Sequence, residues 1–206
     1  MSNIINVKNY PAPEVDMGEI LRYAGCRGET QGEITALIED CLNEVLPILQ
    51  YKLCYITLDK IDTQGSKVLE GILSGCGSVI VFAATLGVEL DRLITKYGKL
   101  SPARAVVLQA IGAERIEGLC NSFCTQLKGQ GMAITQRVSP GYGDIPLSLQ
   151  REIFTILDCP RKIGLTLNKS LLMSPTKSVT AIMGVGKCTA QEKCSVCSKT
   201  DCLFRR

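Results

Sequence analysis

The chain contains no histidine and no tryptophan among its 206 residues. Histidine is the side chain that most often acts as a general base or metal ligand near neutral pH, so its absence excludes Ser-His and Cys-His catalysis by this chain. Aromatic residues make up only 5% of the composition, and the core must therefore rest on aliphatic side chains and cysteine. With 46% hydrophobic and 21% charged residues, the composition is typical of a globular protein.

The sequence also lacks a long apolar run and a targeting segment. The longest apolar stretch, Val79–Leu86, is interrupted by Thr85 and is far shorter than the roughly 20 residues of a membrane-spanning helix. Residues 1–9 show no basic stretch followed by an apolar one, which a secretory signal requires. We therefore expect a cytoplasmic protein without a membrane span.

The sequence has little excess of either charge sign, since 23 basic and 20 acidic side chains leave a net charge of only +3. The C-terminal tail, Lys187–Arg206, carries five basic and two acidic side chains and accounts for the whole excess. No basic stripe is interleaved with aromatic residues, so the sequence does not indicate nucleic-acid binding. Because the same tail is rich in cysteine, we divide the chain into a domain over residues 1–186 and a metal-binding tail over residues 187–206.

Hydrophobic periodicity predicts a mixture of helices and strands. Helices are expected over residues 18–26, 33–49, 86–97, 101–127 and 146–158, and strands over residues 51–58, 78–84, 163–167 and 178–185. Ser101-Pro102 is a favourable start for the longest helix. The elements do not alternate regularly between strand and helix, which favours an α+β domain over a doubly wound sheet.

The first candidate site is a loop rich in glycine and proline, RVSPGYGDIP, which runs from Arg137 to Pro146. Pro140-Gly141 is a turn signal, and glycine lets a backbone approach a ligand closely. The planar guanidinium of Arg137 suits a carboxylate, and Tyr142 offers a flat face with a polar tip. The loop therefore suits an amino-acid-like ligand with a planar portion. The alternative is an ordinary surface loop that leads into the next helix.

This loop and the sequence after it resemble the S-adenosylmethionine-binding activation domain of cobalamin-dependent methionine synthase. Arg-x-Ser-Pro-Gly-Tyr, followed by Pro146, is similar to the ligand loop of that domain. The stretch Lys162–Val179 is similar to the family's IG-x-x-L-T-E-S-x-x-M-x-P-x-x-S-V segment, from which Asn168 and Lys169 depart. Residues 20–25 resemble short stand-alone members. The resemblance implies a twisted, mainly antiparallel sheet with flanking helices.

The resemblance also implies roles for individual residues. Arg137 would bind the methionine carboxylate of S-adenosylmethionine, and Ser139, where the family commonly has alanine, would contact the ligand through its backbone or hydroxyl. Tyr142 would lie between this ligand and a corrin ring. The residues expected to face the corrin are Tyr142, Gly141, Ser170 and Met173.

A glutamate on the long helix before the loop is a further candidate. The family places a glutamate there, near the ligand's ammonium group, and Glu117 fits this position better than Glu114. Independently of the resemblance, Glu117 lies on a stripe of mostly small residues, where a carboxylate needs a partner. The alternative is a solvated glutamate beside the polar strip of the helix.

The implied function is reactivation of a cobalamin-dependent methionine synthase or a related corrinoid protein. One electron and a methyl group from S-adenosylmethionine would convert inactive cob(II)alamin on the partner to methylcobalamin. This step needs positioning and exclusion of water rather than an acid or a base, so we expect no catalytic residue. Without histidine on this chain, any histidine bound to cobalt must belong to the partner.

Three alternatives stay open. The chain could be a docking and protection module for a corrinoid protein without catalytic function, or an electron-relay protein for corrinoid reduction. A methyltransferase with a different acceptor is less well supported, because no G-x-G-x-x-G loop follows a strand.

The second candidate site is a cluster of four cysteines in the tail, Cys188, Cys194, Cys197 and Cys202. Four thiols within a short stretch around a C-x-x-C core have the spacing of metal ligands. A [4Fe–4S] cluster would suit a reaction that needs an electron from a flavodoxin- or ferredoxin-type donor, and zinc is the alternative. Reduced thiols without metal remain the third reading. The other seven cysteines mostly fall on apolar stripes, where we expect core packing.

Overall fold

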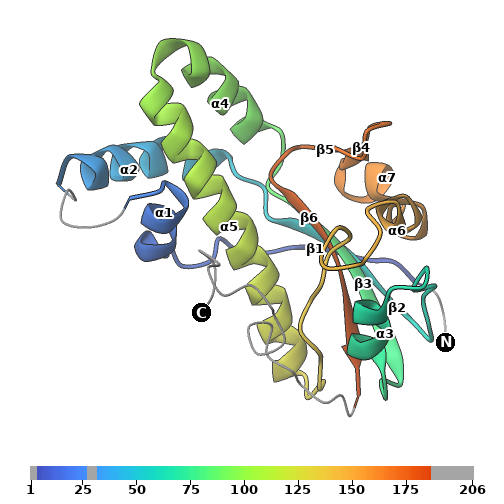
Figure 1. Cartoon of the computed structure of the whole chain (residues 1–206). Coiled ribbons are helices and arrows are strands. Elements are labelled where there is room, and N and C mark those ends of the chain that lie inside the picture. Colours follow the sequence, from blue (N-terminus) through green and yellow to red (C-terminus); the bar gives the residue numbers. More distant parts are fainter. Residues whose placement is uncertain (1–3, 27–31, 187–206) are drawn as a thin grey trace.

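A computed structural model describes residues 4–26 and 32–186 of the chain. Its centre is a four-stranded antiparallel sheet with the strand order β1-β2-β3-β6 (Figure 1). The strands of this sheet are β1 (Asn6–Asn9), β2 (Lys52–Leu58), β3 (Ser78–Thr85) and β6 (Ser178–Val185). A short hairpin of β4 (Thr166–Leu167) and β5 (Met173–Ser174) forms a separate pair.

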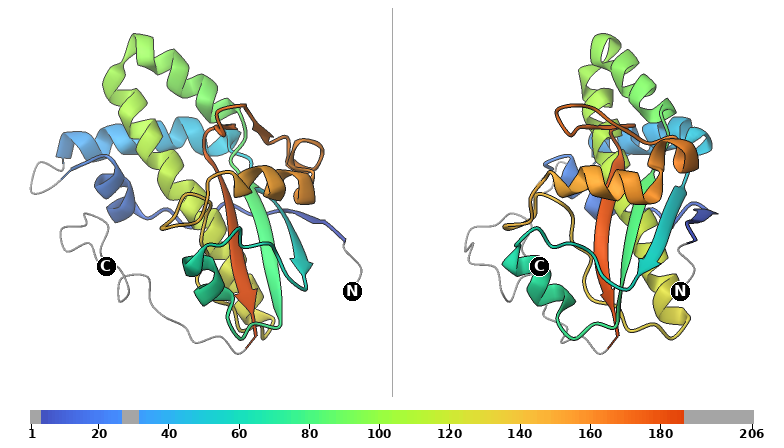
Figure 2. Two further views of the ribbon diagram at one scale, coloured as in Figure 1. Left: turned by 45° about the vertical axis from the view of Figure 1, so that its right-hand side comes forward. Right: turned by 90° about the vertical axis from the view of Figure 1, so that its right-hand side faces the viewer.

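Helices cover both faces of the sheet (Figure 2). The helices that pack with the first face are α1 (Met17–Tyr23), α2 (Gly32–Val45), α4 (Glu89–Leu100) and α5 (Pro102–Gly129). The helices on the second face are α3 (Lys67–Leu73), α6 (Leu149–Leu157) and α7 (Cys159–Ile163). A 3₁₀ turn over Leu46–Ile48 follows α2.

The two faces follow from the alternation of side chains along β3. Ile80 and Phe82 point into the core beneath α5, whereas Val79 and Val81 point into the core beneath α6. All but the first residue of this strand are buried, as expected for a central strand with helices on both sides. The sheet therefore separates two hydrophobic cores.

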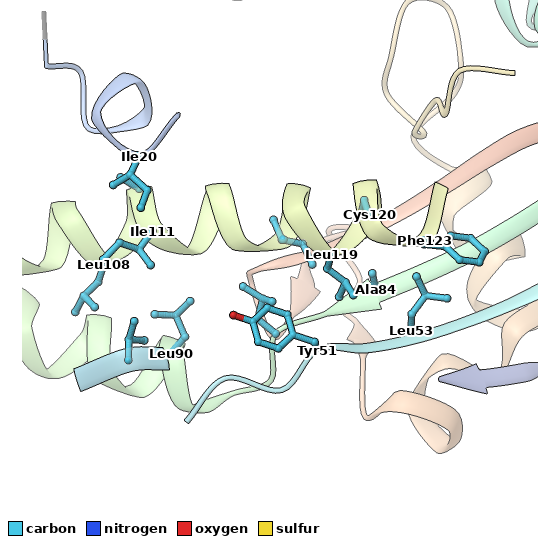
Figure 3. Packing of buried hydrophobic residues seen from close by; sticks show 14 of the residues in the cluster. Ile20, Tyr51, Leu53, Ala84, Leu90, Leu108, Ile111, Leu119, Cys120 and Phe123 are labelled. Carbon is cyan, nitrogen blue, oxygen red and sulfur yellow. The ribbon is translucent and has the colours of Figure 1, made fainter. Parts of the chain in front are cut away.

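The first core is the larger one and is built along α5 (Figure 3). The ring of Phe123 packs against that of Phe82 at 5.1 Å between centroids, in an edge-on arrangement. The rest of this core extends along α5 and consists of buried side chains from α1, α4, α5 and the sheet, among them Ile20, Leu90, Leu108, Ile111, Leu119 and Leu53.

Most of the predicted elements are present, with ends shifted by a few residues. The expected strand over residues 163–167 is wrong, because Ile163 ends helix α7 and only Thr166–Leu167 is extended. Pro160 lies in the first turn of α7, and Gly164 closes that helix with a φ of +71°. Helices α3 and α7 and strands β1 and β5 were not predicted, since each is short.

Seven cysteines lie in the described part of the chain, and none forms a disulfide there. Cys41, Cys54, Cys120 and Cys159 are buried, as expected for core packing. Cys26, Cys76 and Cys124 are only partly buried. Within the described ranges, no helix is both long and apolar enough to cross a bilayer.

The segment before the candidate loop continues the sheet beyond β6. Thr135 donates its backbone N–H to the carbonyl of Gly184 at 2.9 Å, and Val138 exchanges two backbone hydrogen bonds with Ile182, at 3.0 and 2.8 Å. The start of the candidate loop is therefore held against the edge of the sheet.

Candidate functional site

The candidate loop begins with a tight turn. The N–H of Tyr142 donates to the carbonyl of Ser139 at 3.1 Å, and the turn has Pro140 and Gly141 at its two central positions. Gly141 has a φ of +88°, the conformation that a type II turn requires at its third residue. The sequence signal Pro-Gly therefore corresponds to a real turn.

The direction of Arg137 follows from its neighbour in the loop. Val138 is buried in the second core, beneath α6. Successive side chains of an extended segment point to opposite sides, so Arg137 points to the α5 side. Its side chain contacts residues of α5 there.

Arg137 is held by three side chains of α5. Its Nη2 donates to Oε2 of Glu117 at 2.5 Å, its Nη1 donates to Oδ1 of Asn121 at 2.9 Å, and the same Nη1 lies 3.8 Å from Sγ of Cys124. Burial works against the charge of Arg137, but the neighbouring Cys120, Glu117 and Cys124 side chains outweigh this effect and raise its pKa. Arg137 therefore stays cationic at any physiological pH.

The two candidate glutamates of α5 have different partners. Glu114 is buried and binds the adjacent Arg115, whose side chain is fully buried. Glu117 keeps 45% of its side chain exposed and pairs with Arg137, which keeps 18%. Of the two, Glu117 is thus the one that lies beside the candidate loop.

An open hollow of about 530 Å³ lies along the same helix, and Glu117 does not line it. Ligand sites for small molecules commonly have volumes of about 300–1,000 Å³. Asn121, the second partner of Arg137, belongs to its wall, whereas Arg137, Ser139 and Tyr142 do not. The wall is formed between an N-terminal segment and α5, with Pro13, Glu14 and Asp16 on one side and Glu114, Gly118 and Asn121 on the other.

The buried Arg115 fixes the N-terminal wall of this cavity. Its Nη1 donates to the carbonyl of Pro13 at 2.7 Å and its Nη2 to the carbonyl of Glu14 at 2.5 Å. Glu114 accepts the backbone N–H of Asp16 at 3.2 Å. The pair therefore connects α5 to a segment about a hundred residues away in the sequence. No sequence pattern indicates this role, because an arginine in a helix usually faces solvent.

The far end of the candidate loop is anchored by Asp144. Its carboxylate accepts the hydroxyl of Ser66 at 2.5 Å and the backbone N–H groups of Lys67 and Val68 at 2.9 and 3.2 Å, at the start of α3. These hydrogen bonds, with that of Ser66 the largest contribution, lower the pKa of the Asp144 carboxyl. The loop is thus fixed at both ends.

The residues expected to face a corrin lie on two exposed segments. Tyr142 has an exposed fraction of 40% and Gly141 is exposed, both in the candidate loop. Ser170 is exposed in the turn between β4 and β5, whereas Met173 packs partly against the second core. Arg151 of α6 donates to the carbonyl of Lys169 at 3.2 Å, so the helix that follows the loop also contacts the hairpin turn.

The predicted metal ligands Cys188, Cys194, Cys197 and Cys202 lie outside the described residues. Within residues 4–26 and 32–186, no three cysteine or carboxylate side chains gather in a way that could hold a metal ion.

The fold is similar to that of a known structure, described as the MetH reactivation domain bound to AdoHcy. The match covers 88% of this chain and 78% of that chain, with a TM-score of 0.61 and 13% sequence identity. No protein-family model matches the sequence, and no curated protein does. The chain therefore has the α+β fold of that reactivation domain, with the antiparallel sheet and flanking helices expected from the sequence.

Proposed function

We propose that this chain binds S-adenosylmethionine and presents it to a cobalamin carried by a methionine synthase or a related corrinoid protein. The observation that carries the proposal is the position of Arg137, a cation held against α5 by Asn121, whose side chain also lines the open hollow of about 530 Å³. The fold of the described residues is that of a domain whose structure was determined with AdoHcy bound, which supports the same ligand class here.

In this proposal Arg137 binds the carboxylate of the ligand, and Glu117 binds its ammonium group. A guanidinium can donate two parallel hydrogen bonds to a carboxylate, which fixes the orientation of the amino-acid end. The cavity beyond Asn121 would accommodate a further part of the ligand, and the turn at Ser139 would contribute backbone contacts. The ligand supplies a methyl group on a sulfonium, and the residues of this chain hold it in place and shield it from water.

The partner's corrin would meet the exposed side of the loop and of the β4–β5 turn. Tyr142, Gly141, Ser170 and Met173 are the residues we assign to this face. Leu147 and Leu172, exposed to 46% and 65%, add apolar surface on the same two segments.

Isothermal titration calorimetry of the full chain with S-adenosylhomocysteine tests the proposal. Arg137→Ala should weaken binding by about 1.5–3 kcal/mol, because a charge-assisted contact is lost. Arg161→Ala is the matched control, since the Arg161 side chain is 86% exposed and lies on α7, away from the α5 contacts of Arg137. This control variant should bind as the unchanged chain does.

Two outcomes would contradict the proposal. If Arg137→Ala binds with unchanged affinity, the ligand site lies elsewhere on the molecule. If the unchanged chain does not bind the ligand at all, the docking and protection module is the better description.

A further inference from the structure

Two buried cysteines meet in the second core, on the side of the sheet that faces away from α5. Cys54 lies on β2, Cys159 is the first residue of α7, and both are fully buried. Helix α7 packs directly against β2 and β3. The thiol of Cys159 lies within hydrogen-bonding reach of the thiol of Cys54. The proposed function makes no use of this pair.

The contact makes the two thiols chemically unequal. The hydrogen bond from Cys159, with smaller contributions from the backbone of Ala83 and the charge of Lys162, outweighs burial and lowers the pKa of Cys54. The same hydrogen bond and burial raise the pKa of Cys159 far above its usual range. The thiolate is the form of cysteine that reacts with oxidants. Cys54 is therefore the nucleophile of the pair, and Cys159 keeps its proton.

Cys159 lies close to the protein surface, although its own side chain is buried. The next three residues of α7, Pro160, Arg161 and Lys162, are all exposed. The backbone N–H of Leu165 donates to the carbonyl of Cys159 at 3.4 Å, which is a long hydrogen bond. Short elements with exposed residues and weak hydrogen bonds open at a lower free energy than central strands. A small oxidant can therefore reach the pair when α7 opens.

We infer that Cys54 and Cys159 form a redox site that hydrogen peroxide converts to a disulfide. The Cys54 thiolate attacks one peroxide oxygen, the O–O bond breaks, and Cys54 becomes a sulfenic acid while the hydroxide that leaves takes up a proton to give water. The sulfur of Cys159 then attacks the sulfur of Cys54, and the sulfenic oxygen leaves as a second water with the Cys159 proton. Two thiols lose two electrons in all, and one peroxide becomes two waters. A dithiol reductant reverses the reaction.

Core packing is the alternative role of these two cysteines, and a third cysteine represents it. Cys41 is equally buried, in the first core. The groups that act on its thiol are Arg104, Asp40 and Glu44, and no second thiol is among them. Cys41 is therefore the matched control for the pair.

Peptide mapping of the full chain tests the inference. The reduced, folded chain is treated with hydrogen peroxide, the remaining thiols are blocked with N-ethylmaleimide, and the chain is digested with trypsin. The expected product joins residues 53–60 to residues 152–161, because trypsin cleaves after Lys52, Lys60, Arg151 and Arg161. Its mass is that of the two peptides less two hydrogens, and dithiothreitol separates it into them.

Variants and melting curves add two further measurements. Cys54→Ala and Cys159→Ala should each abolish the joined peptide, and Cys41→Ala should leave its yield unchanged. Because the bond closes a loop of about a hundred residues, peroxide should raise the melting temperature of the unchanged chain by about 5–15 °C. Dithiothreitol should reverse this rise, and Cys54→Ala should not show it.

The inference fails if Cys54 and Cys159 are recovered as thiols after peroxide has oxidised the partly buried Cys26. It also fails if Cys54 is oxidised to a sulfinic acid without forming the joined peptide, or is joined mainly to another cysteine. Since the mapping is done on the unchanged chain, a variant that does not fold leaves the test intact. Binding of S-adenosylhomocysteine is measured separately, so the proposed function and this inference can fail independently.

Discussion

At the scale of single residues, two glycines of α5 differ in what a side chain would meet. A Cβ on Gly112 would lie 2.7 Å from Cδ2 of Leu90 and 2.9 Å from Cγ of Lys177, which is too close for packed atoms. A Cβ on Gly118 would lie 3.4 Å from Cβ of Pro13, which is an ordinary contact. The first glycine is therefore required by packing between α4 and α5, and the second is not.

We expect alanine to have opposite effects at these two positions. Gly118→Ala should stabilise the protein by about 0.5–1 kcal/mol, because alanine favours the helix and loses less entropy on folding. Gly112→Ala should destabilise it by about 1–3 kcal/mol, because Leu90 and Lys177 have to move. Urea denaturation of both variants measures the free energy of unfolding. Equal changes in the free energy of unfolding for the two variants would show that helix propensity alone determines the effect of alanine.

The buried Arg115 marks the limit of prediction from the sequence at this scale. The turn at Pro140-Gly141 could be predicted, since its signal lies in adjacent residues. The position of Arg115 could not, because its acceptors are the carbonyls of Pro13 and Glu14, which only the folded chain brings near. The open hollow along α5 was unpredictable for the same reason, since its two walls come from distant segments.

At the scale of elements, the N-terminal segment is attached to α5 by the Glu114–Arg115 pair. Arg115→Leu removes the donors of the Pro13 and Glu14 carbonyls and leaves the Glu114 carboxylate buried without its partner. Breaking a buried pair in this way costs about 3–5 kcal/mol. We therefore expect Arg115→Leu to lower the free energy of unfolding by this amount in urea denaturation.

A double variant separates the buried charge from the lost contacts. In Glu114→Leu with Arg115→Leu no charge is buried without a partner, so part of the stability should return. The two carbonyls still lack their donor, and the recovery should be incomplete. A double variant that is less stable than Arg115→Leu alone would contradict this account.

Elements could be predicted where the hydrophobic pattern is long. β3, β6 and α5 extend over eight, eight and 28 residues; β6 was predicted with both ends correct, and β3 and α5 with errors of one or two residues at their ends. Residues 163–167 were misread because Ile163, Leu165 and Leu167 alternate as in a strand. The first of these closes a short helix that depends on Pro160 and on the left-handed Gly164, which are local effects that an alternation pattern does not show.

At the scale of the whole molecule, the candidate site joins three segments that are distant in the sequence. They are the N-terminal segment around Glu14, helix α5, and the loop that begins at Arg137. A ligand bound there contacts only the folded chain, because the unfolded chain does not bring these segments together. Ligand binding must therefore stabilise the folded state.

We expect S-adenosylhomocysteine to raise the melting temperature. At a free concentration of about 100 times Kd the gain is about 2.7 kcal/mol, which corresponds to about 5–10 °C for a chain of this length. Thermal melts over a series of ligand concentrations measure it. The compound 5′-methylthioadenosine, which lacks the amino-acid end, should give a smaller shift, and equal shifts for both would contradict a role for Arg137.

Residues 133–138 pair with β6, and this pairing limits which mutations the edge of the sheet can tolerate. Because neighbouring side chains point to opposite sides, the position of Val138 on the side of the second core places Arg137 on the side of α5. A single inserted or deleted residue in this stretch would rotate the guanidinium away from α5, although every amino-acid type remained present. This segment can therefore tolerate amino-acid substitutions but not insertions or deletions.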